Sequence, residues 1–584
     1  MEDANWKITN DKVIIRIHNR VCENPDELVN SELFRQIVNL SIDSLIERKS
    51  VLLRMFEAEN IGKKQKILLC ETLKYAHKMP LEMVAKVVEG ADCFLRKKNT
   101  FFNYIEFLYN YWRSYDRFVL CDSAGDALDQ RPYRTFNDTV EELTHLVRRT
   151  YRDIQENITG EHPNVYRQVR AGAGFASIAI KQKIDMPVSN AEKLRDIGII
   201  RQILLNPPLV LDPPMNKRKG KFVRVDVNPL DKVQLKPEEW ICYPVKAGPL
   251  VILAYINEKF YELGLSMANL FEIATDEDLQ RQPDGVYLFG VERDQISGLG
   301  EFDTVFYDDE EHQITVAACP NDDEFGYFGY LKKMILTQHN IRMMKTGRLP
   351  FHGSLTIIRT KDGGKLSILL IGDSGAGKSE TLEAFRQLGQ EILSDLTVIA
   401  DDMGSLDIDD EGIVRGYGTE VGAFLRLDDL SPGMAFGSID RAIFMSAAKT
   451  NARIIIPVTE LYHVLKGVKL DFVLYANNYE VIDEDHPLLD RFESPEEALS
   501  VFREGAVMSK GTTASTGIVH SYFANIFGPP EYRNLHDKLA EKYFAQLFEN
   551  DTFVGQIRTQ LGVPGYERSG PMRAAKALIR QIGK

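Results

Sequence analysis

Residues 369–385 read LLIGDSGAGKSETLEAF, an apolar run, then a cluster of small residues and glycines, then a helix-like run. Gly372, Gly377, Lys378 and Ser379 fit the pattern G-x-x-x-x-G-K-[ST], whose backbone N–H groups turn inward around phosphate oxygens. The lysine supplies a charge at the terminal phosphates, and the serine hydroxyl can reach Mg²⁺. The pattern predicts a loop that binds phosphate or nucleotide through Gly372, Asp373, Ser374, Gly375, Ala376, Gly377, Lys378 and Ser379.

The runs that flank this loop predict the fold class. KLSILLI before the loop is typical of a strand, and SETLEAFRQLG after it is typical of a helix. Similar short apolar runs, such as PLVILAYI, GVYLFGV, GSLTIIRT, LTVIADD, ARIIIPV and DFVLYAN, alternate with helical patterns. We therefore expect an α/β fold with mixed sheets.

The first 180 residues differ from the rest of the chain. Apolar residues recur every three to four positions in SELFRQIVNLSIDSLIE, which predicts a helix, and the aromatic stripe of FFNYIEFLYNYWRSYDRF is best interpreted as helix core. Two Pro-Pro pairs and a basic cluster over 206–222 predict a boundary or linker. We expect a mainly helical N-terminal region, which is a candidate for oligomerisation or regulation.

Composition narrows the functional class. The 71 lysines and arginines against 85 aspartates and glutamates give a net charge of −14, which argues against a general binder of nucleic acid or anionic membranes. None of the six cysteines forms a C-x-x-C pair. The polar N-terminus is unlike a signal peptide, and no apolar run has the length of a membrane span. We expect a cytoplasmic protein that binds neither nucleic acid nor membrane.

Other charged residues form candidate sites around the loop. Asp401 and Asp402 end an apolar strand and could hold a divalent cation, although Asp-Asp at a strand end is also a common solvated turn. His352 begins a strand upstream of the loop, where a lone histidine is more often structural. Lys332 and Lys333 lie near the start of an expected helix, or form a surface pair.

The order of these motifs resembles that of the phosphoenolpyruvate carboxykinase family. The resemblance is carried by YFGYLKKMILTQHNIRMMKTGRLPFHGS, the loop, the Asp-Asp pair, NARIIIPV, FREGAVMSKGTT, NIFGPP and FVGQIRTQLG. It spans roughly 210–584 and is faint before about 320. The text GDSGAGKSE, with HG before it and ADD after it, is also similar to the HPr kinase/phosphorylase family, which shares the same nucleotide-binding core.

The carboxykinase resemblance implies a role for each matching residue. A catalytic Mn²⁺ would be bound by Lys333, His352 and Asp402, with the lysine as a free amine of lowered pKa. Ser379 would hold a nucleotide-bound Mg²⁺, with Asp401 beside that metal. The catalytic set would be Lys333, Lys378, Arg453 and Tyr327.

The implied reaction is decarboxylation followed by phosphoryl transfer. Oxaloacetate would lose carbon dioxide, and the enolate would attack the terminal phosphoryl group to give phosphoenolpyruvate, reversibly. Lys378 and Arg453 would neutralise the transferring phosphate, with Arg453 also contacting substrate and Tyr327 lying beside the phosphoenolpyruvate or carbon dioxide site.

Two departures from the family pattern concern the ligands. Asn216 aligns where the family has its oxaloacetate-binding arginine, so Arg218, two residues on, becomes the candidate substrate ligand. In RSGPMRAAKALI, which is similar to the adenine-contacting stretch, Ala575 replaces the usual threonine. ATP is the expected donor, with pyrophosphate or GTP as alternatives.

Three functions remain open at this point. They are a carboxykinase, a kinase of a protein serine or small-molecule hydroxyl as in the HPr kinase branch, and a non-catalytic nucleotide-binding module. The expected organisation is a helical region over 1–180, a carboxykinase-like α/β substrate domain over 181–345 and a carboxykinase-like P-loop domain over 346–584.

Overall fold

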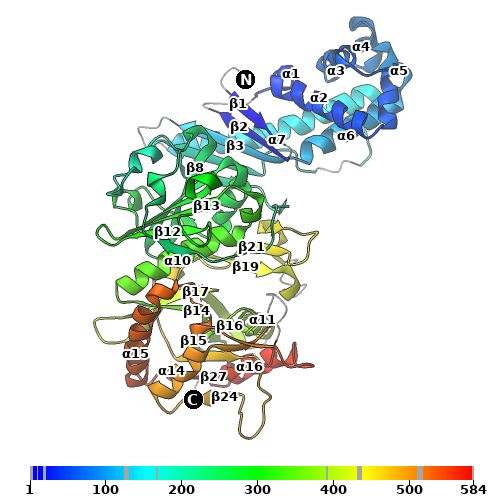
Figure 1. Ribbon diagram of the computed structural model, residues 1–584. Helices are drawn as coiled ribbons and strands as arrows, with labels where there is room; N and C mark the ends of the chain where they lie inside the picture. The colour runs from blue at the N-terminus through cyan, green and yellow to red at the C-terminus, as the bar shows by residue number, and fades with distance from the viewer. Residues whose placement is uncertain are drawn as a thin grey trace. The chain divides into compact units, whose positions relative to one another are not determined.

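The computed structural model describes residues 4–9, 11–17, 22–123, 130–165, 169–389, 392–430, 437–509 and 517–581. The chain forms two compact units, and Figure 1 shows its course by colour and label. The first unit comprises 1–181 and 200–206, and the second comprises 182–199 and 207–584. Both units combine helices with sheets, as the α/β prediction requires.

The first unit is mainly helical, as expected, and it also contains a sheet. Its strands follow the order β1-β2-β3-β4-β5, antiparallel between β1 and β2 and parallel from β2 to β4. The strands are β1 (Ala4–Ile8), β2 (Lys12–Ile17), β3 (Asp116–Ser123), β4 (Phe175–Ile180) and β5 (Ile199–Leu205). The helices are α1 (Pro25–Asn30), α2 (Glu32–Glu47), α3 (Lys63–Ala76), α4 (Leu81–Val87), α5 (Asp92–Arg96), α6 (Lys98–Arg113) and α7 (Gln130–Thr159).

The two helices expected from periodicity are present. Ser31 caps α2 by accepting a hydrogen bond from the N–H of Phe34, and α2 buries its apolar stripe. The aromatic stripe lies on α6, where Phe101 and Tyr104 are fully buried. The stripe is therefore helix core, as expected.

The second unit begins with a mixed sheet in the order β8-β9-β11-β13-β12-β7. These strands are β7 (Val223–Val225), β8 (Trp240–Ala247), β9 (Leu250–Asn257), β11 (Gly285–Val291), β12 (Val305–Asp309) and β13 (Ile314–Pro320), with β10 (Glu272–Ile273) beside β8. Its helices are α8 (Tyr261–Ser266), α9 (Arg293–Ile296) and α10 (Phe328–Lys345). Helix α10 is buried on almost all sides, and it carries the lysine pair.

A second mixed sheet in this unit holds the glycine-rich loop. Its order is β22-β18-β17-β14-β15-β23-β27-β24, with β16 also paired to β14. The strands are β14 (Leu349–Thr360), β15 (Lys365–Ile371), β16 (Leu393–Ala400), β17 (Met403–Ile408), β18 (Val414–Gly418), β22 (Val468–Lys469), β23 (Phe472–Asn477), β24 (Leu489–Arg491) and β27 (Phe553–Arg558). Strands β15, β23 and β27 run parallel, so their carboxyl ends share one edge.

Helices and smaller sheets complete the second unit. The helices are α11 (Lys378–Gly389), α13 (Leu461–Leu465), α14 (Pro495–Glu504), α15 (Arg533–Glu549) and α16 (Ser569–Ile579). Helix α11 packs against β16 and α16. The small sheets are β19 (Gly422–Arg426), β21 (Arg453–Pro457), β20 (Ile443–Met445) and β6 (Leu209–Leu211) in that order, and the pair β25 (Ala506–Met508) and β26 (Ile518–His520).

The stretch 206–222 is not a free linker. The boundary between the two units falls at 206/207, but the residues that follow belong to the structure of the second unit. Strand β6 pairs in parallel with β20, and the backbone of Lys219 exchanges hydrogen bonds with the hydroxyl of Tyr330. The Pro-Pro pairs correctly predicted a boundary, but the pattern did not predict the short strand β6 or the ordered loop that follows it.

Candidate functional site

The glycine-rich loop joins β15 to α11, as the flanking patterns predicted. Gly375 and Gly377 have φ angles of 80° and 98°, which L side chains rarely adopt. A Cβ on Gly377 would lie 2.6 Å from Oγ1 of Thr559, so a side chain has no room there. The loop thus ends at the N-terminus of α11, where backbone N–H groups and the helix dipole favour an anion.

Neighbouring strand ends fix the loop. Asn478, after β23, donates from Nδ2 to the carbonyl oxygen of Gly375 at 2.8 Å, and Thr559, after β27, donates to that of Ala376 at 2.7 Å. Lys378 is buried, and its Nζ donates to the carbonyl oxygens of Gly372 and Asp373. An incoming phosphate would therefore meet a preorganised loop whose lysine already lies among the loop's own carbonyl groups.

A buried charge cluster lies at the junction of β16 and β17. Lys332 of α10 is 3% exposed, and its Nζ lies 2.7 Å from Oδ2 of Asp402 and 3.3 Å from Oε1 of Glu420. Burial raises the pKa of Asp402, but the nearby positive charge of Lys332 acts against burial and holds that pKa well below its usual range. Burial raises the pKa of Glu420 to about 7. Burial also raises the pKa of Asp401, whose carboxyl is electrostatically coupled to Lys332, Asp402 and Lys378.

His352 joins Asp402 from β14. Its Nδ1 contacts the carbonyl oxygen of Ala524, and because a carbonyl only accepts, Nδ1 carries the proton. Its Nε2 lies 2.9 Å from Oδ1 of Asp402. In the neutral ring a lone pair would thus face a carboxylate, and a proton or a cation between the two atoms would satisfy both. A backbone-anchored Nδ1 is also how metal-binding histidines are commonly oriented.

Lys333 differs sharply from its neighbour Lys332. Its Nζ lies 4.4 Å from the centre of the Phe527 ring, whereas Nζ of Lys332 lies beside carboxylates. Burial, and then repulsion by Arg218, lower its pKa to about 8. About a tenth of the side chain is therefore free amine at pH 7, and a free amine is what a lysine needs to bind a metal.

A strained segment supports the histidine and the lysine. Phe523, Ala524, Asn525 and Phe527 all have φ between 45° and 64°, where non-glycine residues cost energy. The segment supplies the Ala524 carbonyl to His352 and the Phe527 ring to both side chains, since the His352 and Phe527 rings are 5.0 Å apart. Strain of this kind persists mainly where it serves a site.

Two arginines and a tyrosine form the other side of the site. Burial raises the pKa of Tyr327, and the charges of Arg453, Lys332 and Arg218 act against this rise, in that order of size. Arg453 lies over the ring of Phe424, and its buried Nε has no hydrogen-bond partner among the described residues. Arg218 lies over Phe222, and its pKa is lowered by burial. A guanidinium with a buried, unused N–H donor is suited to an anionic ligand.

The glycine-rich loop and the charge cluster lie close enough to interact. Nδ1 of His352 lies 4.0 Å from Oδ1 of Asp373 in the loop. Asp373 also acts electrostatically on Lys333, and Lys378 acts on Asp402. The residues suggested by separate motifs therefore lie within electrostatic reach of one another.

The structure places the remaining candidates as follows. Ser379 is in the first turn of α11 and partly buried. Asn216 donates to the carbonyl of Thr450, so Arg218, not Asn216, is the residue of that loop coupled to Lys333. Ala575 is fully buried in the hydrophobic cluster around α11 and α16. Part of the run FREGAVMSKGTT, from 510 on, lies outside the described residues.

Sequence reasoning missed Glu420, Phe527 and Ala524, and it gave Lys332 no role. Glu420 and Lys332 carry no motif of their own, and only burial reveals their pairing. Part of the strained segment, NIFGPP, resembles the carboxykinase family, so the sequence did indicate that this stretch matters. Its backbone conformation and its contacts could not be predicted.

Over the described ranges, no three His, Cys, Asp or Glu side chains meet in a geometry that could hold a metal. The proposed trio includes a lysine, so it is not a set of that kind. No helix in the described part of the chain is both long and apolar enough to cross a membrane. The chain matches no protein-family model, and no curated protein shows significant similarity to it.

Proposed function

We propose that this protein catalyses metal-dependent phosphoryl transfer, with oxaloacetate decarboxylated and phosphorylated to phosphoenolpyruvate and carbon dioxide. The observation that carries the proposal is the pairing of a phosphate loop with a lysine of lowered pKa beside His352 and Asp402. A loop alone would fit any nucleotide-binding protein. Burying Lys333 with a lowered pKa reduces the stability of the fold. A role as metal ligand in phosphoryl transfer to an enolate would explain why such a residue is present.

Each side chain has a role in this reaction. Arg218 and Arg453 would bind the substrate carboxylates, because guanidinium groups match carboxylate oxygens in pairs. Lys378 and the loop N–H groups would hold the donor's terminal phosphates and offset the charge that develops on transfer. Tyr327, held neutral by its raised pKa, would donate a hydrogen bond next to the carbon dioxide position.

The donor set fits a divalent cation. Nε2 of His352, Oδ1 of Asp402 and the free amine of Lys333 are nitrogen and oxygen ligands of the kind that Mn²⁺ accepts, and Ser379 and Asp401 would serve an Mg²⁺ at the phosphates. When bound, the cation would stabilise negative charge on the substrate oxygens.

The donor is expected to be ATP, with pyrophosphate or GTP as alternatives. Ala575 packs in the core, so its side chain offers nothing to a nucleotide base. The phosphate end of the site, in contrast, is complete. Titration calorimetry with ATP and pyrophosphate separates these cases.

The decisive experiment measures phosphoenolpyruvate formation from oxaloacetate with Mn²⁺ and each of the three donors. We expect turnover by the wild-type protein that is lost in Lys333→Met and retained in Lys361→Met, a lysine on the turn after β14. Phosphate transfer to protein serine without phosphoenolpyruvate formation would favour the HPr-kinase-like alternative. Donor binding with no transfer to any acceptor would indicate a binding module.

A further inference from the structure

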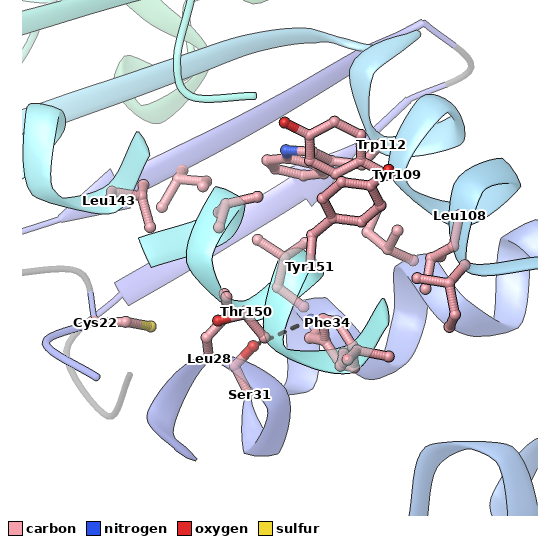
Figure 2. A pocket seen from close by; sticks show the side chains of 16 residues that line it. Cys22, Leu28, Ser31, Phe34, Leu108, Tyr109, Trp112, Leu143, Thr150 and Tyr151 are labelled. Atoms are coloured by element: carbon pink, nitrogen blue, oxygen red, sulfur yellow. Dashed lines mark hydrogen bonds between the residues drawn. The ribbon is translucent and has the colours of Figure 1, made fainter. Parts of the chain in front are cut away.

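The first unit contains an apolar cavity that the proposed chemistry does not use. It is lined by β2 and by helices α1, α2, α6 and α7 and is partly open, and Figure 2 shows the side chains around it. The space open to the centres of water-sized spheres is about 100 Å³. Aromatic residues form part of its wall, where the rings of Tyr109 and Tyr151 stack with centroids 4.0 Å apart beside Trp112.

The polar atoms of the lining are engaged elsewhere. The hydroxyl of Tyr109 donates to the Val169 carbonyl at 3.1 Å, and the indole N–H of Trp112 donates to the Ala171 carbonyl at 2.7 Å. Thr150 donates to the carbonyl of Leu146 one helical turn earlier, and Tyr151 donates to Glu106. The surface that faces the cavity is therefore almost entirely carbon.

This arrangement disfavours ordered water and charged ligands. A buried water needs two to four polar partners, and the engaged groups leave none pointing inward. A carboxylate or ammonium would lose its hydration without compensation. Native cores rarely retain voids larger than a water molecule, because the lining atoms lose dispersion contacts.

We propose that the first unit binds a small neutral apolar molecule in this cavity. A closed hydrocarbon cavity of roughly 150 Å³ accepts benzene, and the space here is smaller but partly open, so a single ring or a short chain of a few carbons fits with part of the molecule outside it. The aromatic wall favours a flat ring. The proposal is independent of the phosphoryl-transfer function, because every residue involved belongs to the first unit.

The test uses the full chain and the tryptophan at the cavity. Bromobenzene quenches tryptophan fluorescence on contact, and 4-bromobenzoate is its charged counterpart of similar size. We expect saturable quenching by bromobenzene and at least tenfold weaker binding of 4-bromobenzoate. Trp112→Phe should remove the saturable component, although Trp6 and Trp240 remain.

The second part of the test fills the cavity with a larger side chain. Val147→Phe on α7 should weaken bromobenzene binding at least tenfold, whereas Val87→Phe, at an exposed position of α4, should leave it unchanged. If circular dichroism shows that Val147→Phe does not fold, Ile37→Phe fills the cavity from α2 instead. Quenching that never saturates, or that survives both Trp112→Phe and the filling variant, would overturn the proposal.

Discussion

Adjacent lysines of α10 should respond in opposite ways to the same substitution. Lys333→Met and Lys332→Met each remove one charge and keep most of the apolar stem. Lys333 is charged at a thermodynamic cost, because its pKa falls from 10.5 to about 8 on folding. Lys332 is held between two carboxylates, and its pKa is raised. We expect Lys333→Met to stabilise the second unit and Lys332→Met to destabilise it.

The magnitudes follow from these environments. A depression of two to three pKa units corresponds to about 3 kcal/mol, which is the upper bound for the gain from Lys333→Met at pH 7. The size of this cost depends on pH, but its sign does not. Below pH 8 the lysine is charged in both states and the cost is complete, whereas above 10.5 it is neutral in both and the cost vanishes. Removing Lys332 leaves Asp402 and Glu420 uncompensated, a loss of about 3–5 kcal/mol.

The assay is urea unfolding in the presence of EDTA. Trp240 is buried in the second unit, and the other two tryptophans are in the first, so a Trp6→Phe, Trp112→Phe background reports the second unit alone. Lys236→Met serves as the control, because its ion pair with Glu239 is exposed and should not affect the midpoint measurably.

The pH profile tests the reasoning most directly. The gain from Lys333→Met should be present at pH 7 and should fade toward pH 10. Equal destabilisation by the two substitutions, or a gain that does not change with pH, would show that the two lysines do not have the environments described here.

Three further predictions concern the site itself. Lys378→Ala should lower turnover about 100-fold or more with unchanged circular dichroism, because its charge is most valuable as the phosphate transfers; near-normal kcat would contradict its role. Gly377→Ala should abolish donor binding in calorimetry, since φ is 98° and the new methyl group would meet Thr559, whereas Gly565→Ala, with φ of 87° but open space around it, should bind normally. Mn²⁺ affinity should rise up to about 50-fold from pH 6 to pH 8 as Lys333 loses its proton, and then level off. Calorimetry should find that the affinity of Lys333→Met depends less on pH. Equal pH dependence in the two proteins would exclude the amine as a ligand.

Local patterns were sufficient to predict the strand, loop and helix around Gly372–Ser379. Gly375 and Gly377 have positive φ angles that other residues rarely adopt, so the glycines in the sequence indicate this backbone conformation. The helices α2 and α6 were likewise predictable, because a sustained apolar periodicity leaves few alternatives. Short strands such as β1 and β2 were missed, since a run of five or six residues fits several structures equally well.

The charge cluster could not be derived from local sequence. Asp402 lies 70 residues from Lys332 along the chain, and the Ala524 carbonyl lies 172 residues from His352. Which of two adjacent lysines meets a carboxylate depends on the rotation of α10 about its axis, and a helix buried on almost all sides carries no amphipathic pattern that would reveal it.

The rotation of α10 explains how two identical side chains acquire different chemistry. Successive helical residues point about 100° apart, so Lys332 and Lys333 face different surroundings although they are neighbours. Lys332 neutralises Asp402 and Glu420 and thereby keeps a carboxylate ionised in a buried place. That ionised carboxylate favours a cation next to His352, while Lys333, left with an aromatic ring and a neighbouring guanidinium, gives up its proton readily. Lys332 thus keeps Asp402 ionised, and Lys333 is proposed to bind the metal directly. Replacing Lys332 with an uncharged residue should weaken metal binding through Asp402, whereas replacing Lys333 should remove a ligand.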